Sequence, residues 1–232
     1  MINKLILLLM LTLSIQVFSQ KTISRQRIVK QVTTFNPDEV YNKNTGEKIP
    51  KEEVVRMIQM DSKTYFDAVY DNSGNIVKHL YDPDHLGSSR LNSTLYKTPE
   101  KNEIFPNLIL TTVDGEVMEI KDLRGKMVIL RMDMNAGSFN HQIKKLDKAI
   151  NETGRKSEIE SIIIFHSSKD EIESGFDLKT SNFKLIPNGI NFQNMLNIRV
   201  IPTTFVLDKE GKVLDVSSSS HRMNFLKLLN ES

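Results

Sequence analysis

Two apolar segments separated by a helical one constrain the fold of this chain most. Residues 127–132 form a dense apolar run and residues 159–165 form another, the pattern of strands buried on both faces of a sheet. Between them, residues 138–151 place Ile143, Leu146 and Ile150 on one helical face. We therefore expect a strand, a helix and a second strand as one unit of an α/β domain.

A hairpin follows this unit along the chain. Residues 203–207 and 212–216 read as strands that are joined by a turn at 209–211, and a closing helix is expected over 223–229. Further elements are expected as a strand over 105–112 and short helices over 191–197 and after Lys169. This order predicts an α/β fold with a mixed sheet flanked by helices.

The first hundred residues have a different pattern. A loosely alternating segment over 22–35 suggests a strand, and residues 51–60 suggest a helix with acidic residues in its first turn. Residues 65–70 and 75–81 suggest a hairpin, with Gly74 in its turn. A polar stretch up to about residue 103 reads as a linker. We expect a small N-terminal α+β region with its linker over 20–100 and a second domain over 101–232.

The N-terminus resembles a secretory signal peptide. Lys4 precedes a short apolar run over 5–13, and residues 17–19 fit a cleavage site, so we expect cleavage after Ser19. The run is short for a membrane span. We predict a periplasmic or secreted protein without a membrane span after cleavage. A lipoprotein is excluded, because the chain lacks the cysteine that lipidation requires.

Composition narrows the function. The chain has 31 Lys+Arg and 29 Asp+Glu, a formal net charge of +2, and no basic block, so nucleic acid is not an expected partner. It contains no cysteine, although an exported protein can use disulfides. Stability is therefore expected from burial and hydrogen bonding alone.

Three short motifs follow one another in the second domain. They are Phe105-Pro106-Asn107-Leu108 with Asp114-Gly115, Leu123-Arg124-Gly125-Lys126, and Ile201-Pro202-Thr203-Thr204-Phe205. In this order they resemble the thioredoxin superfamily, closest to the TlpA/ResA-like thiol-disulfide oxidoreductases and their peroxiredoxin relatives. The resemblance covers about residues 104–230 and implies a thioredoxin-like fold with a cis bond before Pro202.

The catalytic motif of that family is missing here. The four positions of its Cys-x-x-Cys motif correspond to Gly137, Ser138, Phe139 and Asn140, and the preceding Trp position corresponds to Ala136. The family places cysteines there because a helix N-terminus lowers the pKa of a thiol. None of these residues can form a thiolate. We therefore expect a degenerate, redox-inactive member with neither enzyme activity nor a cofactor.

The resemblance also implies a surface that can persist without the reaction. In the family, the loop before the cis proline pairs with an extended substrate segment. We therefore expect this chain to bind an extended peptide or a protein partner at the former active site, as a binding or assembly module. The candidate residues are Ala136, Gly137, Ser138, Phe139, Asn140, His141, Ile201, Pro202 and Thr203. A vestigial groove is the alternative at this surface.

Other functions remain as alternatives. An enzyme of a non-thiol class, or a metal-binding protein, would use histidines and carboxylates on the same scaffold. The candidate groups are Ser138, His141 and Asp133 as a hydrolase triad, Met132, Asp133, Met134 and His141 as a copper site, and His79, Asp82, Asp84 and His85 as a metal cluster. We favour a helix cap for Ser138, core packing for both methionines and a solvated loop for the last cluster. His166 and His221 are read as ordinary residues. A third possibility is a structural role in which residues 20–100 make the contacts.

Overall fold

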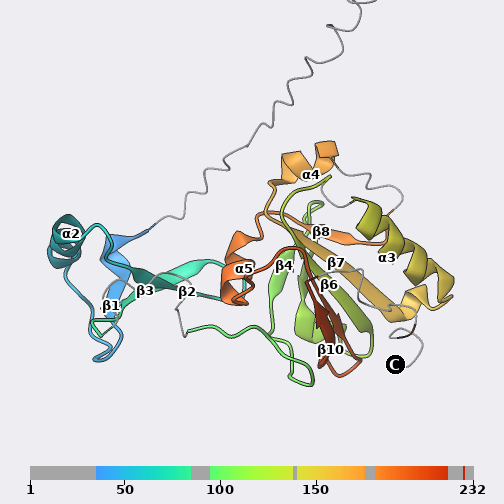
Figure 1. Ribbon diagram of the computed structural model, residues 1–232, viewed down its shortest axis with the longest axis horizontal. Coiled ribbons are helices and arrows are strands. Elements are labelled where there is room, and N and C mark those ends of the chain that lie inside the picture. Colours follow the sequence, from blue (N-terminus) through green and yellow to red (C-terminus); the bar gives the residue numbers. More distant parts are fainter. Residues whose placement is uncertain (1–34, 85–94, 138–139, 176–180, 219–226, 228–232) are drawn as a thin grey trace, which may run out of the picture. The chain divides into compact units, whose positions relative to one another are not determined.

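A computed structural model describes residues 35–84, 95–137, 140–175, 181–218 and 227 of this chain (Figure 1). The predicted signal peptide, the strand expected over 22–35 and most of the helix expected over 223–229 lie outside these residues. Within them, no helix is both long and apolar enough to cross a membrane.

The first region forms a three-stranded sheet. Its elements are a 3-10 turn η2 (Pro37–Glu39) and β1 (Val40–Asn42), then α2 (Lys51–Met60), β2 (Phe66–Tyr70) and β3 (Ile76–Tyr81). The strands lie in the order β1-β3-β2, with β1 parallel and β2 antiparallel to β3. The predicted helix and hairpin are both confirmed, whereas the short strand β1 was not predicted.

The second region is built on a five-stranded sheet. Its strands are β6 (Met127–Asp133), β7 (Ile159–Phe165), β8 (Lys184–Ile186), β9 (Thr203–Leu207) and β10 (Val213–Ser217). Their order is β10-β9-β6-β7-β8; β6, β7 and β8 run parallel, and β9 is antiparallel to both β6 and β10. This is the mixed sheet that the sequence predicts, and the thioredoxin-like fold class is confirmed.

Helices and two short strands surround this sheet. They are β4 (Ile109–Thr111), β5 (Val117–Glu119), η4 (Ile120–Leu123), α3 (Asn140–Glu152), η5 (Lys156–Glu158), α4 (Lys169–Gly175) and α5 (Ile190–Met195). The helices expected before and after β7 are confirmed as α3, α4 and α5. The strand expected over 105–112 is shorter, because only β4 pairs, with β5.

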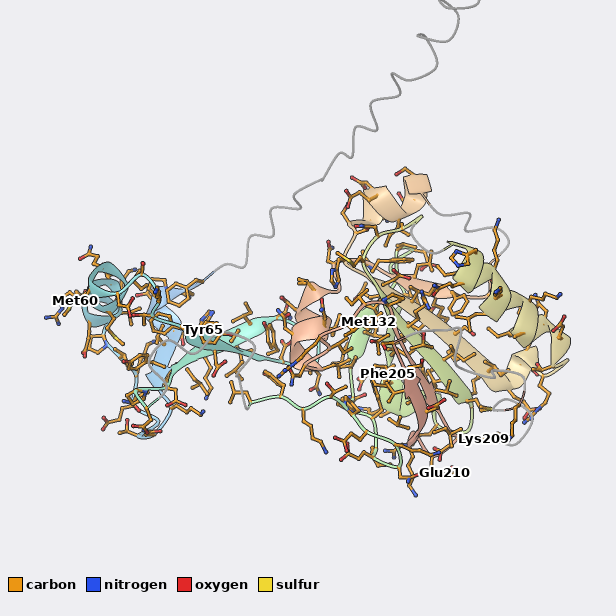
Figure 2. All side chains as sticks on the ribbon, in the orientation of Figure 1. Met60, Tyr65, Met132, Phe205, Lys209 and Glu210 are labelled. Atoms are coloured by element: carbon orange, nitrogen blue, oxygen red, sulfur yellow. The ribbon has the colours of Figure 1, made fainter. Side chains whose placement is uncertain are left out.

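The sheet separates two apolar clusters. Alternation along β6 sends Met127 and Ile129 to the face that α3 covers, where Ile143, Leu146 and Ile150 pack. Val128, Leu130 and Met132 point to the opposite face and pack with Phe192 of α5. Figure 2 shows Met132 and Phe205 within this second cluster, whereas Met60 projects from α2 and is 88% exposed.

Two glycines permit close backbone approach. A Cβ on Gly189 would lie 2.2 Å from Cγ2 of Ile164, because the loop before α5 crosses the end of β7. Gly74 has a φ of +78° in the turn between β2 and β3, and a Cβ there would lie 3.2 Å from the ring of Phe192. Nearby, Asn191 Nδ2 donates to Gly74 O over 2.9 Å. The hairpin turn therefore packs directly on α5.

Candidate functional site

A cis peptide bond joins Ile201 and Pro202, immediately before β9. This is the configuration that the resemblance implies. The loop is held by Thr203, whose Oγ1 donates to the carbonyl oxygen of Val200 over 2.6 Å. Pro202 and Thr203 are buried and Ile201 is half-buried, whereas Val200 is 55% exposed. The loop thus presents an apolar side chain to solvent beside a buried proline.

A second loop leaves the sheet next to the first. Met132 of β6 pairs with Thr203 of β9, so residues 134 and 201 follow from neighbouring strand ends. Ala136 N–H donates to Ser167 Oγ over 3.2 Å, which ties this loop to the end of β7. Met134 is 49% exposed, so the prediction that both methionines pack in the core is correct for Met132 and wrong for Met134. The strand ends at Asp133, and Met134 lies beyond the sheet.

We call residues 134–137 and 199–203 the rim. Of the nine residues predicted to form the groove, five belong to it: Ala136, Gly137, Ile201, Pro202 and Thr203. Ser138 and Phe139 lie outside the described residues. Asn140 begins α3, and His141 is exposed in its first turn. Sequence reasoning missed Met134 and Val200, whose exposure depends on where the strands end.

The rim presents backbone groups as well as apolar side chains. Among the residues that the structure describes, neither the N–H nor the C=O of Ile201 takes part in a backbone hydrogen bond. A backbone N–H and C=O without partners in the fold can pair with another extended chain. Ile201 lies between the exposed Val200 and the buried Pro202, so these groups occur where an apolar contact is also available.

A charged network lies beneath the rim. Arg131 and Asp133 are both fully buried in β6, and Nε and Nη2 of Arg131 each lie 3.0 Å from Oδ2 of Asp133. Arg131 also donates from Nη2 to Gln142 Oε1 over 3.0 Å and from Nη1 to Thr204 Oγ1 over 3.4 Å. Oδ1 of Asp133 accepts the N–H of Met134 over 2.9 Å. The sequence argument did not identify this network, although two charges within an apolar strand are a visible signal.

Burial dominates the electrostatics of this pair. Loss of solvent raises the pKa of the Asp133 carboxyl, while the adjacent Arg131 guanidinium opposes that rise. Burial likewise lowers the pKa of Arg131. Because each charge is compensated only by the other and by a few hydrogen bonds, removing one partner alone leaves a buried charge without its counterion.

The alternative sites are divided among separate contacts. Asp82 pairs with Lys43 over 2.7 Å, and Asp84 accepts a hydrogen bond from Asn44 Nδ2 over 2.7 Å. His79 is buried against Phe35 with ring centroids 4.8 Å apart, and burial lowers its pKa. His85 and His221 lie outside the described residues. Over the described part of the chain, no three His, Cys, Asp or Glu side chains form a group that could hold a metal ion.

The proposed triad and copper groups are also divided. Asp133 is directed to Arg131, Met132 lies in the core, and Met134 is exposed. His166 contacts the same region through its backbone, since its N–H donates to the carbonyl oxygens of Asp133 and Met134 over 3.2 and 3.1 Å. The fold therefore uses this end of the sheet to position backbone rather than to gather catalytic side chains.

Comparison with known proteins agrees with the topology. Residues of this chain are 28% identical over 115 positions to a thiol-disulfide oxidoreductase ResA of Bacillus cereus, covering 47% of this chain and 65% of that protein, so the match spans just under two thirds of the relative's length. The chain belongs to the thioredoxin-like superfamily. A second ResA of B. cereus, from strain ATCC 10987, is 27% identical over 139 residues, which cover 55% of this chain and 79% of that protein. No family model matches the chain.

Solved structures with a similar arrangement include two from Bacteroides. A thiol-disulfide oxidoreductase from B. fragilis NCTC 9343 has a TM-score of 0.47 and 14% identity, covering 56% of this chain and 98% of that one. The thioredoxin domain of a thiol-disulfide oxidoreductase from B. vulgatus has a TM-score of 0.45 and 19% identity, covering 58% and 97%.

The superfamily member described here has no thiol. The relatives are named as thiol-disulfide oxidoreductases, whereas this chain contains no cysteine at any position. Attack on a disulfide requires a thiolate, so the thiol chemistry of those relatives has no nucleophile here.

Proposed function

We propose that this protein is an exported, redox-inactive binding module that holds an extended peptide segment of a partner at the rim. The observation that carries the proposal is the pair of backbone groups on Ile201, which lie beside the cis bond and have no backbone partner among the described residues. Addition of a strand to such groups is an established way of recognising an extended peptide.

The side chains around Ile201 support the same use. Val200 and Met134 are 55% and 49% exposed, and each belongs to a loop at this end of the sheet. Backbone pairing supplies affinity without sequence preference, whereas contacts with alternate side chains supply specificity. We therefore expect the bound segment to place apolar residues against Val200 and Met134, with its backbone opposite Ile201.

Export and the absence of enzymatic activity are further parts of this proposal. Residues 1–19 have the charge, length and apolar run of a secretory signal, which supports a periplasmic or secreted location. The chain has no cysteine, and within the described residues the candidate histidines and carboxylates are dispersed. Binding without turnover is the function that these residues support best.

Selection from a random peptide library tests the proposal. Residues 20–232 are immobilised and a displayed library of short random peptides is selected on them, and the enriched peptides are measured by calorimetry. Two rim variants, Ile201→Asp and Val200→Asp, place a charge within the proposed contact. Val117→Asp is the matched control, because Val117 of β5 is 64% exposed and lies outside the rim.

The expected result is enrichment of extended apolar peptides that bind the wild type and the Val117→Asp control equally. We expect each rim variant to lose at least about tenfold in affinity, the scale of one desolvated apolar contact. Equal binding by all four proteins would place the function elsewhere, with residues 35–84 as the next region to test. Failure to enrich any peptide would contradict the proposal.

A further inference from the structure

The buried charges of β6 lie where three segments of the site meet. Arg131 contacts Asp133 on its own strand, Gln142 in the first turns of α3 and Thr204 at the start of β9. Asp133 in turn accepts the N–H of Met134, the first residue of the rim. One guanidinium therefore connects both rim loops and the helix that follows them.

Folding alone does not account for this arrangement. A buried ion pair carries a large desolvation cost, and replacing such a pair with apolar residues is often neutral or stabilising. The remaining positions of β6 that face α3, Met127 and Ile129, are apolar and fully packed. Arg131 and Asp133 continue the same face towards the rim, where apolar side chains would serve packing equally well.

The geometry of arginine suits a positioning role. Its planar guanidinium offers five donors in fixed directions, so its contacts constrain both distance and angle. Here these donors reach a carboxylate, an amide oxygen and a hydroxyl, which come from β6, α3 and β9. Apolar packing in the same space would tolerate small rotations and shifts that these hydrogen bonds do not.

We infer that Arg131 and Asp133 are positioning residues, which hold the two rim loops at the spacing that a bound peptide requires. This inference rests on the proposed function for its peptide, but its structural part concerns the rim alone. Removal of the network loosens residues 134–137 and 199–201 locally, while the two apolar clusters keep the sheet intact.

The test compares two double variants of the same strand. Arg131→Met with Asp133→Leu removes the network and retains side-chain volume. Lys126→Met with Glu160→Leu is the matched control, because it removes an ion pair of 3.1 Å at the opposite end of β6 and β7. Amide hydrogen exchange is measured for both rim loops and for β6, together with urea denaturation and the affinity for a peptide selected on the wild type.

We expect the Arg131→Met, Asp133→Leu variant to unfold at the same or higher urea concentration than the wild type. Exchange in 134–137 and 199–201 should be at least tenfold faster and peptide affinity at least tenfold weaker, with β6 unchanged. The control should match the wild type in both rim exchange and affinity. Wild-type rim exchange and wild-type affinity in the first variant would show that the network serves packing alone, and would overturn the inference.

Two further results keep the inference separate from the proposed function. If no peptide binds the wild type, the proposed function fails, and the rim exchange rates alone decide whether Arg131 and Asp133 position the rim. If the double variant does not fold, Gln142→Met removes only the link to α3. We then expect faster exchange in the rim at unchanged protection of β6, and an unchanged rim would contradict the inference.

Discussion

The two ends of β6 are built differently. At its start, Met127, Val128, Ile129 and Leu130 are buried and apolar on both faces of the sheet. At its end, Arg131 and Asp133 replace the apolar residues on the α3 face, and Met134 beyond the strand is exposed. The first end has only the requirements of a core, whereas the second combines buried charge with exposed apolar surface.

This contrast separates stability from function along a single strand. A core needs volume and burial, which the first end supplies. Buried charges and exposed methionine or valine side chains contribute little to stability or oppose it, and such departures from simple packing are expected at functional positions. The rim end should therefore be the part that can be altered with loss of binding and little loss of fold.

Breaking the charged end on one side should produce the largest effect. Arg131→Ala leaves the Asp133 carboxylate buried without its counterion, and we expect the free energy of unfolding to fall by about 3–5 kcal/mol. Urea denaturation followed by circular dichroism measures this loss. A loss below about 1 kcal/mol would mean that Asp133 finds another partner or is solvated, contrary to its full burial.

Truncation at the apolar end should cost slightly less. Leu130 is fully buried in the cluster shared with Phe205, and Leu130→Ala should lower the free energy of unfolding by about 2–5 kcal/mol through lost contacts and a cavity. Because Leu130 does not contact the rim network, peptide affinity at a temperature where the variant is folded should equal that of the wild type. A specific loss of affinity in the folded variant would blur the contrast between the two ends.

The end of the neighbouring strand offers a sharper geometric test. Gly189→Ala would place a methyl group 2.2 Å from Cγ2 of Ile164 and 2.9 Å from the Phe165 oxygen, and we expect a loss of about 1–3 kcal/mol in unfolding free energy. Gly175→Ala is the control, since its nearest non-neighbouring atom would be 3.4 Å away. Equal stabilities for the two variants would show that the loop before α5 shifts to accommodate the methyl group.

The smallest effect on stability should come from the rim surface. Val200→Asp alters a side chain that is 55% exposed, so the free energy of unfolding should change by no more than about 0.5 kcal/mol. Thermal denaturation of the wild type, Val200→Asp and Val117→Asp checks this expectation. A large loss confined to Val200→Asp would indicate that the loop before the cis bond is a structural element rather than an open surface.

Much of this architecture follows from local pattern. The apolar runs at 127–132 and 159–165 and the helical spacing of Ile143, Leu146 and Ile150 predict β6, β7 and α3 correctly. The short strands β5 and β8 were missed, because three residues carry too little periodicity to be distinguished from loop.

The site was only partly predictable for a different reason. The motif around Pro202 identified one loop of the rim, but the exposure of Met134 depends on β6 ending at Asp133. Arg131 reaches residues 11 and 73 positions away in the sequence, and only the tertiary fold brings Gln142 and Thr204 within reach. Local periodicity contains no information on such contacts.

Amide hydrogen exchange of the wild type, with and without a peptide selected on it, tests the central claim most directly. We predict that bound peptide slows exchange of the N–H groups of Val200, Ile201 and Thr203 and leaves those of β1, β2 and β3 unchanged. Protection confined to residues 40–81, with the rim unaffected, would contradict the account and assign binding to the N-terminal sheet.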